Sequence, residues 1–543
     1  MFPLKAGRAT TAASPRLRQR TLDSFLVPKG PTAPVAVDSA SHECCRVTLP
    51  WSKENRCCEN AGHVCNAWEV IISVLAEDAS QNTDDLQLLL QKLCFCDSFG
   101  RLSSMFHFGM LCHVVDHLLT PSERAAFFDV TLPWMKRLVR EGPVTLPHDL
   151  EALLQGTSRR LMLTHEEAVT LLVCGFFSLF PGRCFTSNSR RASSCKLAPF
   201  NFADLFCTAS PARLESNCAK IRCLLEYFIY WSHHTSPVKT CLEFYRVCFA
   251  SFPDFGRSSK PMENICMDSK GRIEDNYGKL QVDFANKVLG GGVLQTGCVQ
   301  EEIQFVTCPE LLLSRLLSEP LLDTEALFMS GAGRYSLSEG YAGGFRFVRG
   351  QSPHVVVSSV DAGIPRETCV EFASTPLRDK KDGSAILMPN SCVVAMDAVN
   401  FQNRVGKQYT ASSLTRETRK AFVAFKGATD STLPSVHSGP VATGNWGCGA
   451  FGGDRQLKLM IQWCAASEAQ RSLIYSTFND ESLCCQFRPV YEKLQREKWS
   501  VGNVFMVLLA FSRYCTTSPT PSVGEGKLFQ YILSLQRSLC ELL

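Results

Sequence analysis

The sequence lacks a hydrophobic run long enough to cross a membrane. Its longest apolar stretch, residues 169–180, is shorter than the roughly 20 residues that a spanning helix needs, and it ends in Phe180-Pro181-Gly182. Basic residues near the N-terminus are not followed by an apolar segment, which argues against a secretory signal. We therefore expect a soluble protein that makes no membrane contact, with residues 169–180 forming a buried helix.

Paired CxxC motifs and a strong excess of one charge are also missing. The 27 cysteines are scattered rather than arranged in a small framework, which is typical of reduced thiols in a nuclear or cytosolic protein. A structural zinc site is the alternative for one group of cysteines and histidines, although this group contains no CxxC pair: His42, Cys44, Cys45, Cys57, Cys58, His63 and Cys65. The net charge of +4 is too small to indicate nucleic-acid binding by itself. We expect no metal, and no direct nucleic-acid binding is required.

Residues 1–40 combine basic residues with Ala, Thr, Ser and Pro and show little apolar periodicity, so they are expected to be disordered. Within them, Gln19–Leu26 has the spacing of a peptide that docks on the replication sliding clamp. Leu22 and Phe25 would fill a pocket, although Leu26 stands where such peptides carry a second aromatic residue. The basic residues favour nuclear localisation, with the cytoplasm also open. The alternative is an unstructured tail with chance hydrophobic residues.

Residues 41–254 have a helical pattern. Leucines at helical spacing mark one buried face: Leu86, Leu89, Leu90 and Leu93. Residues 120–123 and residues 164–167 each form a capping box, and the first carries Pro121 at the first helical position. No catalytic constellation assembles here, so we expect an all-helical accessory region.

Residues 255–515 change to short apolar strands separated by Gly, Asn and Asp, with helices between them. The predicted strands are 354–360, 392–396 and 473–478, and residues 456–469 are predicted to be a helix. This alternation predicts a layered α/β domain. Residues 516–543 are expected to be a linker and a helix that docks back onto the protein.

The most informative stretch of this α/β domain joins a strand, three glycines and an acidic cluster. Alternating apolar residues over Leu280–Phe284 predict a strand, with Asp283 near its end and Asn286 just after it. The run Gly290-Gly291-Gly292 then precedes Gln300-Glu301-Glu302. Consecutive glycines let backbone N–H groups approach a phosphate or diphosphate, and the carboxylates can do acid–base work on the group attached to it. The structural alternative is that the two glutamates only favour a helix N-terminus.

A second glycine-rich element, residues 443–454, leads directly into the helix predicted from Arg455. Its backbone amides and the positive end of the helix dipole would together form an anion site. A single loop of this kind is more often a tight turn. Two such loops in one α/β domain, with acids beside one of them, favour a nucleotide-like ligand with a central diphosphate.

These motifs resemble those of poly(ADP-ribose) glycohydrolases, which have a macrodomain core preceded by a helical region. The similarity begins near Leu161 and runs in order along the chain through 176–181, 201–202, 273–275, 283–302, 341–342, 395–398, 443–454 and 475–480. It implies a three-layer α/β/α macrodomain-like fold with a mixed sheet. It also implies an enzyme that cleaves ribose-ribose O-glycosidic bonds of poly(ADP-ribose), releases ADP-ribose and uses no cofactor.

The resemblance makes Glu302 the general acid/base, which protonates the leaving 2′-oxygen and then activates water. It places Glu301 and Asn286 at ribose hydroxyls, Asp283 in support of the acidic cluster and Gln300 in ligand orientation. Adjacent helical positions point about 100° apart, so the two glutamates are not equivalent. Nearby carboxylates disfavour joint ionisation, which helps one of them to keep a proton near neutral pH.

The resemblance also assigns the remaining ligand contacts. The adenine would lie against Ile273, Glu274 and Phe478, since a base needs an apolar wall and an acceptor for its amine. Phe478 alone would more often be a core residue. Tyr341 is similar to a substrate-lining tyrosine of the family, although Gly343-Gly344 follows where the family usually carries bulkier residues. The distal ribose and diphosphate would lie along Asn445 and Phe451.

Two other functions remain open at this stage. One is a macrodomain that binds ADP-ribose without cutting it, although such a reader has no need for Gln300-Glu301-Glu302 beside the ribose loop. The other is a clamp-associated scaffold, which rests on Gln19–Leu26 alone. An enzyme would keep polymer cleavage after residues 1–40 are deleted.

Overall fold

The computed structural model describes residues 46–58, 64–94, 107–181, 197–207, 211–234, 241–353, 377–378, 385–386, 392–427, 439–517 and 526–535. These residues all belong to one compact unit, Cys45–Leu543. The predicted tail of residues 1–40, its peptide Gln19–Leu26 and the strand predicted over 354–360 lie outside the described residues.

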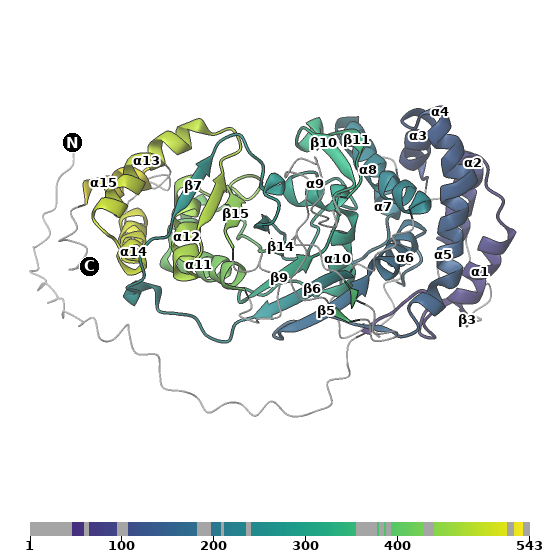
Figure 1. The fold of residues 1–543 in the computed structure, drawn as a ribbon, viewed down its shortest axis with the longest axis horizontal. Coiled ribbons are helices and arrows are strands. Elements are labelled where there is room, and N and C mark those ends of the chain that lie inside the picture. The colour runs from purple at the N-terminus through teal and green to yellow at the C-terminus, as the bar shows by residue number, and fades with distance from the viewer. Residues whose placement is uncertain are drawn as a thin grey trace, which may run out of the picture. The chain divides into compact units, whose positions relative to one another are not determined.

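A mixed sheet, to which the described residues contribute eight strands, organises this unit (Figure 1). The strands lie in the order β5-β6-β9-β14-β8-β15-β16-β7. Pairing is antiparallel from β5 to β14 and parallel from β14 to β7. The strands are β5 Arg159–Thr164, β6 Cys241–Cys248, β7 Ile265–Asp268, β8 Leu280–Asp283, β9 Glu325–Ser330, β14 Cys392–Ala395, β15 Val441–Gly444 and β16 Leu473–Ser476. The predicted mixed sheet is confirmed, and β8, β14 and β16 lie where strands were predicted.

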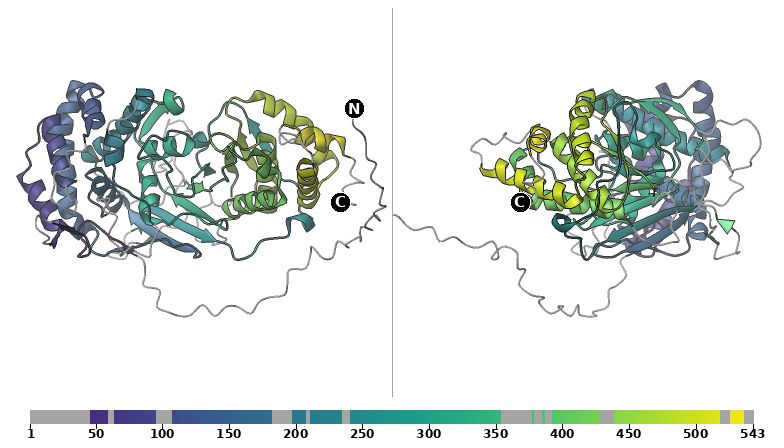
Figure 2. Two further views of the ribbon diagram at one scale, coloured as in Figure 1. Left: turned by 180° about the vertical axis from the view of Figure 1, so that it is seen from behind. Right: turned by 60° about the vertical axis from the view of Figure 1, so that its left-hand side comes forward.

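Alternate side chains of the central strands enter two different hydrophobic clusters. In β9, Leu327 and Met329 pack with one group of helices, whereas Ala326 and Phe328 pack with the other. The first group includes α6 His165–Phe176, α8 Leu214–His233, α9 Gln300–Thr307 and α10 Leu313–Leu317. The second includes α11 Ala411–Lys426, α12 Arg455–Glu468, α13 Glu481–Arg496 and α14 Val501–Thr517. The two groups lie on opposite sides of β9 and β14 (Figures 1 and 2), which confirms the three-layer α/β/α core.

Helices dominate the chain before residue 254, as predicted. They include α1 Ala67–Glu77, α2 Thr83–Leu93, α3 Gly109–His117, α4 Pro121–Ala126, α5 Leu132–Thr145 and α7 Ala203–Phe206. The predicted leucine face of α2 is buried. Both capping boxes are present, at the start of α4 with Thr120 and Glu123 and at the start of α6 with Thr164 and Glu167.

The region before residue 254 is not helical throughout, because β5 and β6 from this region join the main sheet. The structure pairs β6 with β9, more than 70 residues further along the chain. Arg246 of β6 is fully buried and forms an ion pair with Glu325 of β9. A buried charge at this position interrupts the apolar alternation from which a strand is predicted. The ion pair that stabilises the charge joins residues that are distant in the sequence, so local patterns do not indicate it.

Short two-stranded elements and a docked C-terminal helix complete the described chain. The pairs are β1 Arg46–Val47 with β4 Leu150–Glu151, β2 Arg56–Cys58 with β3 Val64–Asn66, β10 Ser336–Glu339 with β11 Arg346–Gly350, and β12 Leu377–Arg378 with β13 Ala385–Ile386. The helix α15 Leu528–Ser534 buries Leu528, Phe529 and Ile532 in the second hydrophobic cluster. The predicted docking of the closing helix is confirmed.

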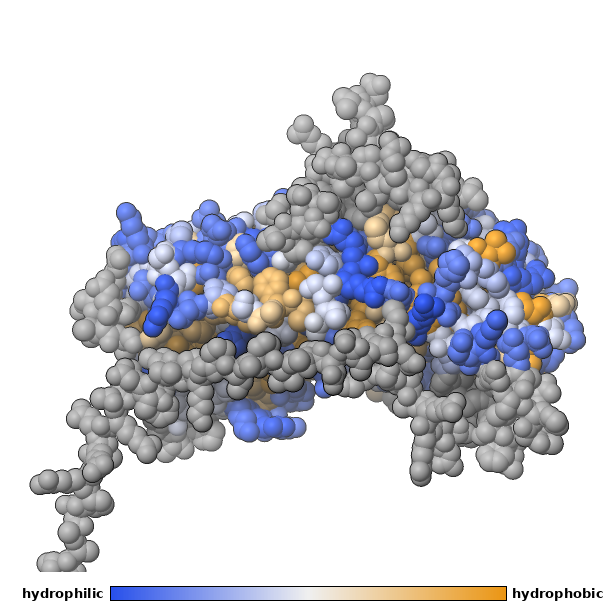
Figure 3. Space-filling view, turned by 90° about the horizontal axis from the view of Figure 1, so that it is seen from below, coloured by the Kyte–Doolittle hydropathy of each residue, from blue (hydrophilic) through white to orange (hydrophobic). Residues whose placement is uncertain are grey.

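No helix in the described ranges is both long and apolar enough to span a lipid bilayer. Figure 3 shows the side of the molecule on which β5 and β6 lie in Figure 1. Hydrophobic residues show in the middle of this face between hydrophilic ones.

Candidate active site

The acidic cluster lies where β8 ends and α9 begins. Asp283 is the last residue of β8, a strand near the middle of the sheet. The chain then forms a loop, residues 284–299, which we call the acid loop, and returns as α9 with Gln300, Glu301 and Glu302 in its first turn. The strand and helix therefore bring all three predicted acids together at the carboxyl end of β8.

Backbone N–H groups of the acid loop hold the two glutamates. Glu302 accepts hydrogen bonds from Gly292 N (2.9 Å) and from Val299 N (2.9 Å), the second of which closes a turn at the start of α9. Glu301 accepts from Gly290 N (2.7 Å) and from Asn286 N (3.0 Å). Each carboxylate is thus held by its own pair of backbone amides.

This arrangement changes the role predicted for the three glycines. The N–H groups of Gly290 and Gly292 bind carboxylates, and that of Gly291 donates to the Val288 carbonyl (3.1 Å), so none of the three is directed at a diphosphate. Glycine is needed here because the carboxylates leave no room for side chains. A Cβ on Gly291 would lie 2.6 Å from Glu302 Oε1 and 2.7 Å from Glu301 Oε2.

Asp283 is the most deeply buried acid of the cluster. It is 0% exposed, and neither carboxyl oxygen has a hydrogen-bond partner among the described residues. Burial raises the pKa of Asp283 well above its usual range, and the charges of Glu302 and Glu274 act in the same direction. Burial also raises the pKa of Glu301, with further contributions from Asp283 and Glu302. These directions favour a cluster that retains a proton near neutral pH, as predicted.

Gln300 connects the acidic cluster to the residues predicted to bind adenine. Its Oε1 accepts from Phe284 N (2.8 Å), and its Nε2 donates to Glu274 Oε1 (3.0 Å). Ile273, one residue before Glu274 in a single 3-10 turn, is 5% exposed. The predicted adenine acceptor and apolar wall thus lie next to the end of β8.

Two exposed aromatic rings stand beside this region. Tyr341 and Phe478 lie with ring centres 5.1 Å apart, and they are 39% and 62% exposed. The alternative interpretation of Phe478 as a core residue is therefore wrong. Although the residue is 39% exposed, partial desolvation raises the pKa of Tyr341 to about 12, while a hydrogen bond with the Gln300 backbone acts in the opposite direction. An open aromatic pair beside buried acids is suited to hold a flat ring.

The second glycine-rich loop, residues 444–453, follows β15 and precedes α12; we call it the amide loop. Its internal hydrogen bonds use the N–H groups of Trp446, Cys448, Gly452 and Gly453. Among the described residues, the N–H groups of Gly449, Ala450 and Phe451 have no hydrogen-bond partner. These consecutive amides fit an anion.

Two details of the amide loop differ from expectation. The N-terminus of α12 is not open, because Asp454 caps it by accepting from Leu457 N (2.7 Å). The side chain of Asn445 is also engaged, since its Nδ2 donates to the Thr477 carbonyl (2.9 Å) and its Oδ1 accepts from the Tyr475 hydroxyl (3.3 Å). Asn445 thus fixes the loop to β16, and an anion would meet the loop rather than the helix end.

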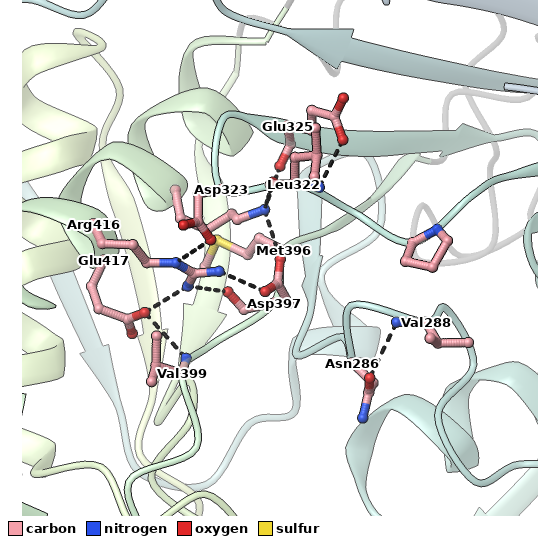
Figure 4. Close-up of polar contacts among 12 residues, drawn as sticks. Asn286, Val288, Leu322, Asp323, Glu325, Met396, Asp397, Val399, Arg416 and Glu417 are labelled. Carbon is pink, nitrogen blue, oxygen red and sulfur yellow. Dashed lines mark hydrogen bonds and ion pairs between the residues drawn. The ribbon is translucent and has the colours of Figure 1, made fainter. Parts of the chain in front are cut away.

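A network of buried charges lies behind the amide loop. Figure 4 shows Arg416 of α11 between Asp397 and Glu417, to which it donates at 2.6 Å each. Lys458 of α12 pairs with Glu417, and its Nζ lies 3.9 Å from the ring centre of Trp446 in the loop. Burial lowers the pKa of Lys458 well below its usual range. The network joins α11 and α12 to the amide loop from behind.

Two cations that contact the acid loop were missed in the sequence, Lys220 of α8 and Arg315 of α10. Lys220 has a signal that could have indicated it, because it lies at helical spacing with the buried residues Asn217, Cys223 and Leu224. A charge on an otherwise buried helix face needs a partner. The sequence does not show which partner that is.

Among the described residues, no group of three or more His, Cys, Asp and Glu side chains could hold a metal ion. Of the cysteine and histidine group near the N-terminus, Cys57 and Cys65 lie opposite each other in the β2–β3 pair. His42, Cys44, Cys45 and His63 lie outside the described residues.

Fold and site together define an α/β protein of the macrodomain type with a buried carboxylate cluster suited to acid–base chemistry on a glycosidic bond. Residues 252–485 match the family model of the poly(ADP-ribose) glycohydrolase macro domain fold, and residues 119–246 match that of the family's helical domain. The chain belongs to the poly(ADP-ribose) glycohydrolase family.

Curated relatives agree with this assignment. Poly(ADP-ribose) glycohydrolase 1 of Arabidopsis thaliana is 30% identical over 73% of this chain and 80% of its own length. Poly(ADP-ribose) glycohydrolase 1 of Caenorhabditis elegans is 33% identical over 44% of this chain and 28% of its own. Poly(ADP-ribose) glycohydrolase 2 of the same organism is 31% identical over 46% and 48%.

Proposed function

We propose that this protein hydrolyses the ribose-ribose O-glycosidic bonds of poly(ADP-ribose) and releases ADP-ribose, with Glu302 as general acid/base. The observation that carries the proposal is the placement of Glu302. Glu302 is 6% exposed, and two backbone amides hold its carboxylate beside two acids whose pKa values are raised. A carboxyl group fixed in this way can protonate a leaving oxygen without first reorganising.

Glu302 would protonate the leaving 2′-oxygen and then remove a proton from the attacking water. Most glycosidases use two facing carboxylates. Here the two glutamates are held by separate pairs of amides, and we assign Glu301, held by Asn286 and Gly290, to the ribose and the cluster charge. We propose that the substrate's own diphosphate helps to stabilise the oxocarbenium-like charge.

The geometry supports a division of the ligand among four places. The free amides of residues 449–451 suit the diphosphate, with Asn445 and Phe451 beside it. The adenine would lie against Ile273, Glu274 and Phe478, with Tyr341 covering the proximal ribose. The Oδ1 of Asn286 accepts from Val288 N at 3.1 Å (Figure 4), so its Nδ2 remains to donate to a ribose hydroxyl.

The test replaces the acid with a side chain of the same shape that keeps one of its two hydrogen bonds, the one from Val299 N. We expect Glu302→Gln to abolish release of ADP-ribose from automodified, polymer-bearing protein, while ADP-ribose affinity stays within about threefold, since glutamine keeps the cap at the start of α9. The matched control is Glu167→Gln, because Glu167 occupies the same capping position at the start of α6. Normal turnover by Glu302→Gln would remove Glu302 from the mechanism. Binding without cleavage by the wild type would indicate an ADP-ribose reader.

No cofactor is needed in this scheme, because carboxylates and backbone amides supply every role. Activity should therefore persist in a metal chelator. Loss of activity that a divalent ion restores would contradict it.

We further propose that the enzyme acts in the nucleus, where it reverses poly-ADP-ribosylation in the DNA damage response and docks on the sliding clamp through Gln19–Leu26. Support comes from the basic tail and the peptide spacing alone. Deletion of residues 1–40 should preserve polymer cleavage and reduce nuclear accumulation. The pair Leu22→Ala and Phe25→Ala should abolish clamp binding in a pull-down with purified clamp, and unchanged binding would refute the docking.

A further inference from the structure

Lys220 contacts the acid loop from behind through three hydrogen bonds. Its Nζ donates to the carbonyls of Val293 (3.0 Å), Gln295 (2.7 Å) and Gly297 (2.8 Å). An ammonium group has three donors, so every one is used. Lys220 lies on α8, a helix from outside the segment that carries the acids. The helical region therefore reaches directly to the loop that holds Glu302.

Arg315 of α10 contacts the preceding part of the same loop. Its Nη1 donates to the carbonyls of Leu289 (3.1 Å) and Gly291 (3.0 Å). Its Nε donates to the Pro199 carbonyl (2.7 Å). Two cations from two helices thus hold five carbonyl groups of the acid loop.

The acid loop has a consistent polarity as a result. Its N–H groups at Gly290, Gly292 and Val299 point to the glutamates, while its carbonyls at alternating positions point to Lys220 and Arg315. A peptide plane cannot rotate to move one group without moving the other. Arg315 thereby fixes the N–H groups of Gly290 and Gly292, which share peptide planes with the two carbonyls that it holds. Lys220 fixes the next part of the loop, residues 293–297, which joins Gly292 to Val299, the two residues whose amides bind Glu302.

Lys220 differs from the other buried lysines in its partners. Of the buried lysines that the structure describes, Lys136, Lys420 and Lys458 each form an ion pair with a carboxylate. Lys220 is 0% exposed and bonds only to carbonyls. A buried charge without an ion pair is costly for folding. The position of Lys220 at the back of an acidic site is better explained by a role in that site than by a contribution to stability.

We propose that Lys220 is a positioning residue for the glycosidase reaction: it holds the acid loop so that Gly292 and Val299 keep Glu302 in place at the bond to be cleaved. Arg315 assists at the neighbouring turn. The proposal rests on the catalytic role proposed for Glu302. Lys220 does not touch the substrate, so its loss should lower kcat and leave KM nearly unchanged.

The titration of Lys220 supplies a readout that a purely structural role would not give. Burial lowers its pKa to about 8; Cys298 and Glu302 raise it, and Arg213 lowers it further. Above that pH the amine keeps only two donors for three carbonyls. The kcat of the wild type should therefore fall as pH rises through about 8.

Stability should change in the opposite direction over the same range. Because the folded pKa of Lys220 lies below its usual value of 10.5, the unfolded chain binds the proton more strongly between about 8 and 10.5. The contribution of this group to the free energy of unfolding rises as pH increases through that window. A loss of kcat caused by unfolding would instead follow a loss of stability.

The experiment compares Lys220→Met and Lys220→Arg with wild type on polymer-bearing protein between pH 6 and about 10. We expect Lys220→Met to lose kcat by about 10-fold to 100-fold, with KM and ADP-ribose affinity within about threefold, and to lack the fall above pH 8. Lys220→Arg should recover part of kcat and keep it to higher pH, since guanidinium stays charged.

The matched control is Lys136→Met, which removes a buried lysine of α5 that pairs with Asp78. It should lower stability and leave the pH profile unchanged. Wild-type kcat in Lys220→Met, or an equal loss in Lys136→Met, would overturn the proposal. If Lys220→Met does not fold, a wild-type kcat that stays flat to pH 10 in folded protein overturns it, and a fall near 8 that Lys220→Arg removes supports it. Absence of cleavage by the wild type would refute the proposed function instead.

Discussion

The two glycine-rich loops of this protein use the same residue for opposite purposes. In the acid loop, the N–H groups of Gly290 and Gly292 bind Glu301 and Glu302. In the amide loop, the N–H groups of residues 449–451 have no partner among the described residues. One loop is already filled by carboxylates of the chain, and the other is open to an anion. Glycine content alone therefore does not identify a phosphate site; the direction of the N–H groups does.

The charged side chains around the two loops also differ. The acid loop has acids in front and the cations Lys220 and Arg315 behind. The amide loop has the buried cation Lys458 behind it, and the carboxylate of Asp454 is used to cap α12. Each loop thus presents to the ligand what the reaction would need there, a proton donor at one end and an anion site at the other.

The largest expected effect comes from filling the acid loop. In Gly291→Ala the new Cβ would lie 2.6 Å from Glu302 and 2.7 Å from Glu301, at a φ of +47°. Displaced carboxylates should lower kcat by about 100-fold or more. The control is Gly156→Ala, which has a φ of +76° but nothing within 4 Å of the added Cβ. Both variants share the backbone strain, so steady-state kinetics beside thermal unfolding isolates the carboxylate contact. Equal kcat in the two variants would contradict the packing argument.

Local patterns predicted the strand that leads into the site and two helices of the region before it. The alternation at Leu280, Val282 and Phe284 placed β8 correctly, and the capping residues at Thr120 and Thr164 placed two helix starts. Each of these signals involves residues a few positions apart. Short-range geometry of this kind depends on the sequence itself.

Long-range contacts were not predictable in the same way. Lys220 is more than 70 residues from the carbonyls that it holds, and nothing at Val293 or Gly297 indicates a lysine partner. The direction of the N–H groups in the acid loop depends on the positive φ of Gly290 and Gly291, which a glycine permits but does not specify. For this reason the sequence located the loop and misassigned its amides.

A smaller effect, on ADP-ribose affinity, is expected from a substitution in the amide loop. Gly449 has a free N–H and nothing within 4 Å of an added Cβ, so Gly449→Ala should leave stability unchanged. If a diphosphate approaches this backbone closely, the methyl group should weaken ADP-ribose binding by about 10-fold, measured by calorimetry. The control is Gly344→Ala, which also has nothing within 4 Å of an added Cβ and lies outside the amide loop. Unchanged ADP-ribose affinity in Gly449→Ala would place the diphosphate elsewhere.

The smallest expected effect is on the free energy of unfolding, and it comes from Asp283, beside the acid loop. Asp283 is buried, without a hydrogen-bond partner among the described residues, and burial raises its pKa well above the usual value of 3.8. The folded protein then binds a proton that the unfolded chain releases, so this group lowers the free energy of unfolding as pH rises above about 4. Asp283→Asn removes the titration with little change of shape. We expect the variant to be more stable than wild type by on the order of 1–2 kcal/mol at pH 8, and the difference to shrink towards pH 4.

Thermal unfolding of wild type and Asp283→Asn at pH 5 and 8 measures this difference, and the control is a substitution of an exposed aspartate, Asp129→Asn. A wild type that gains stability over Asp283→Asn as pH rises would mean that Asp283 is ionised and paired in the folded protein, and the acids beside the acid loop would then not retain the proton that sets this loop apart from the amide loop.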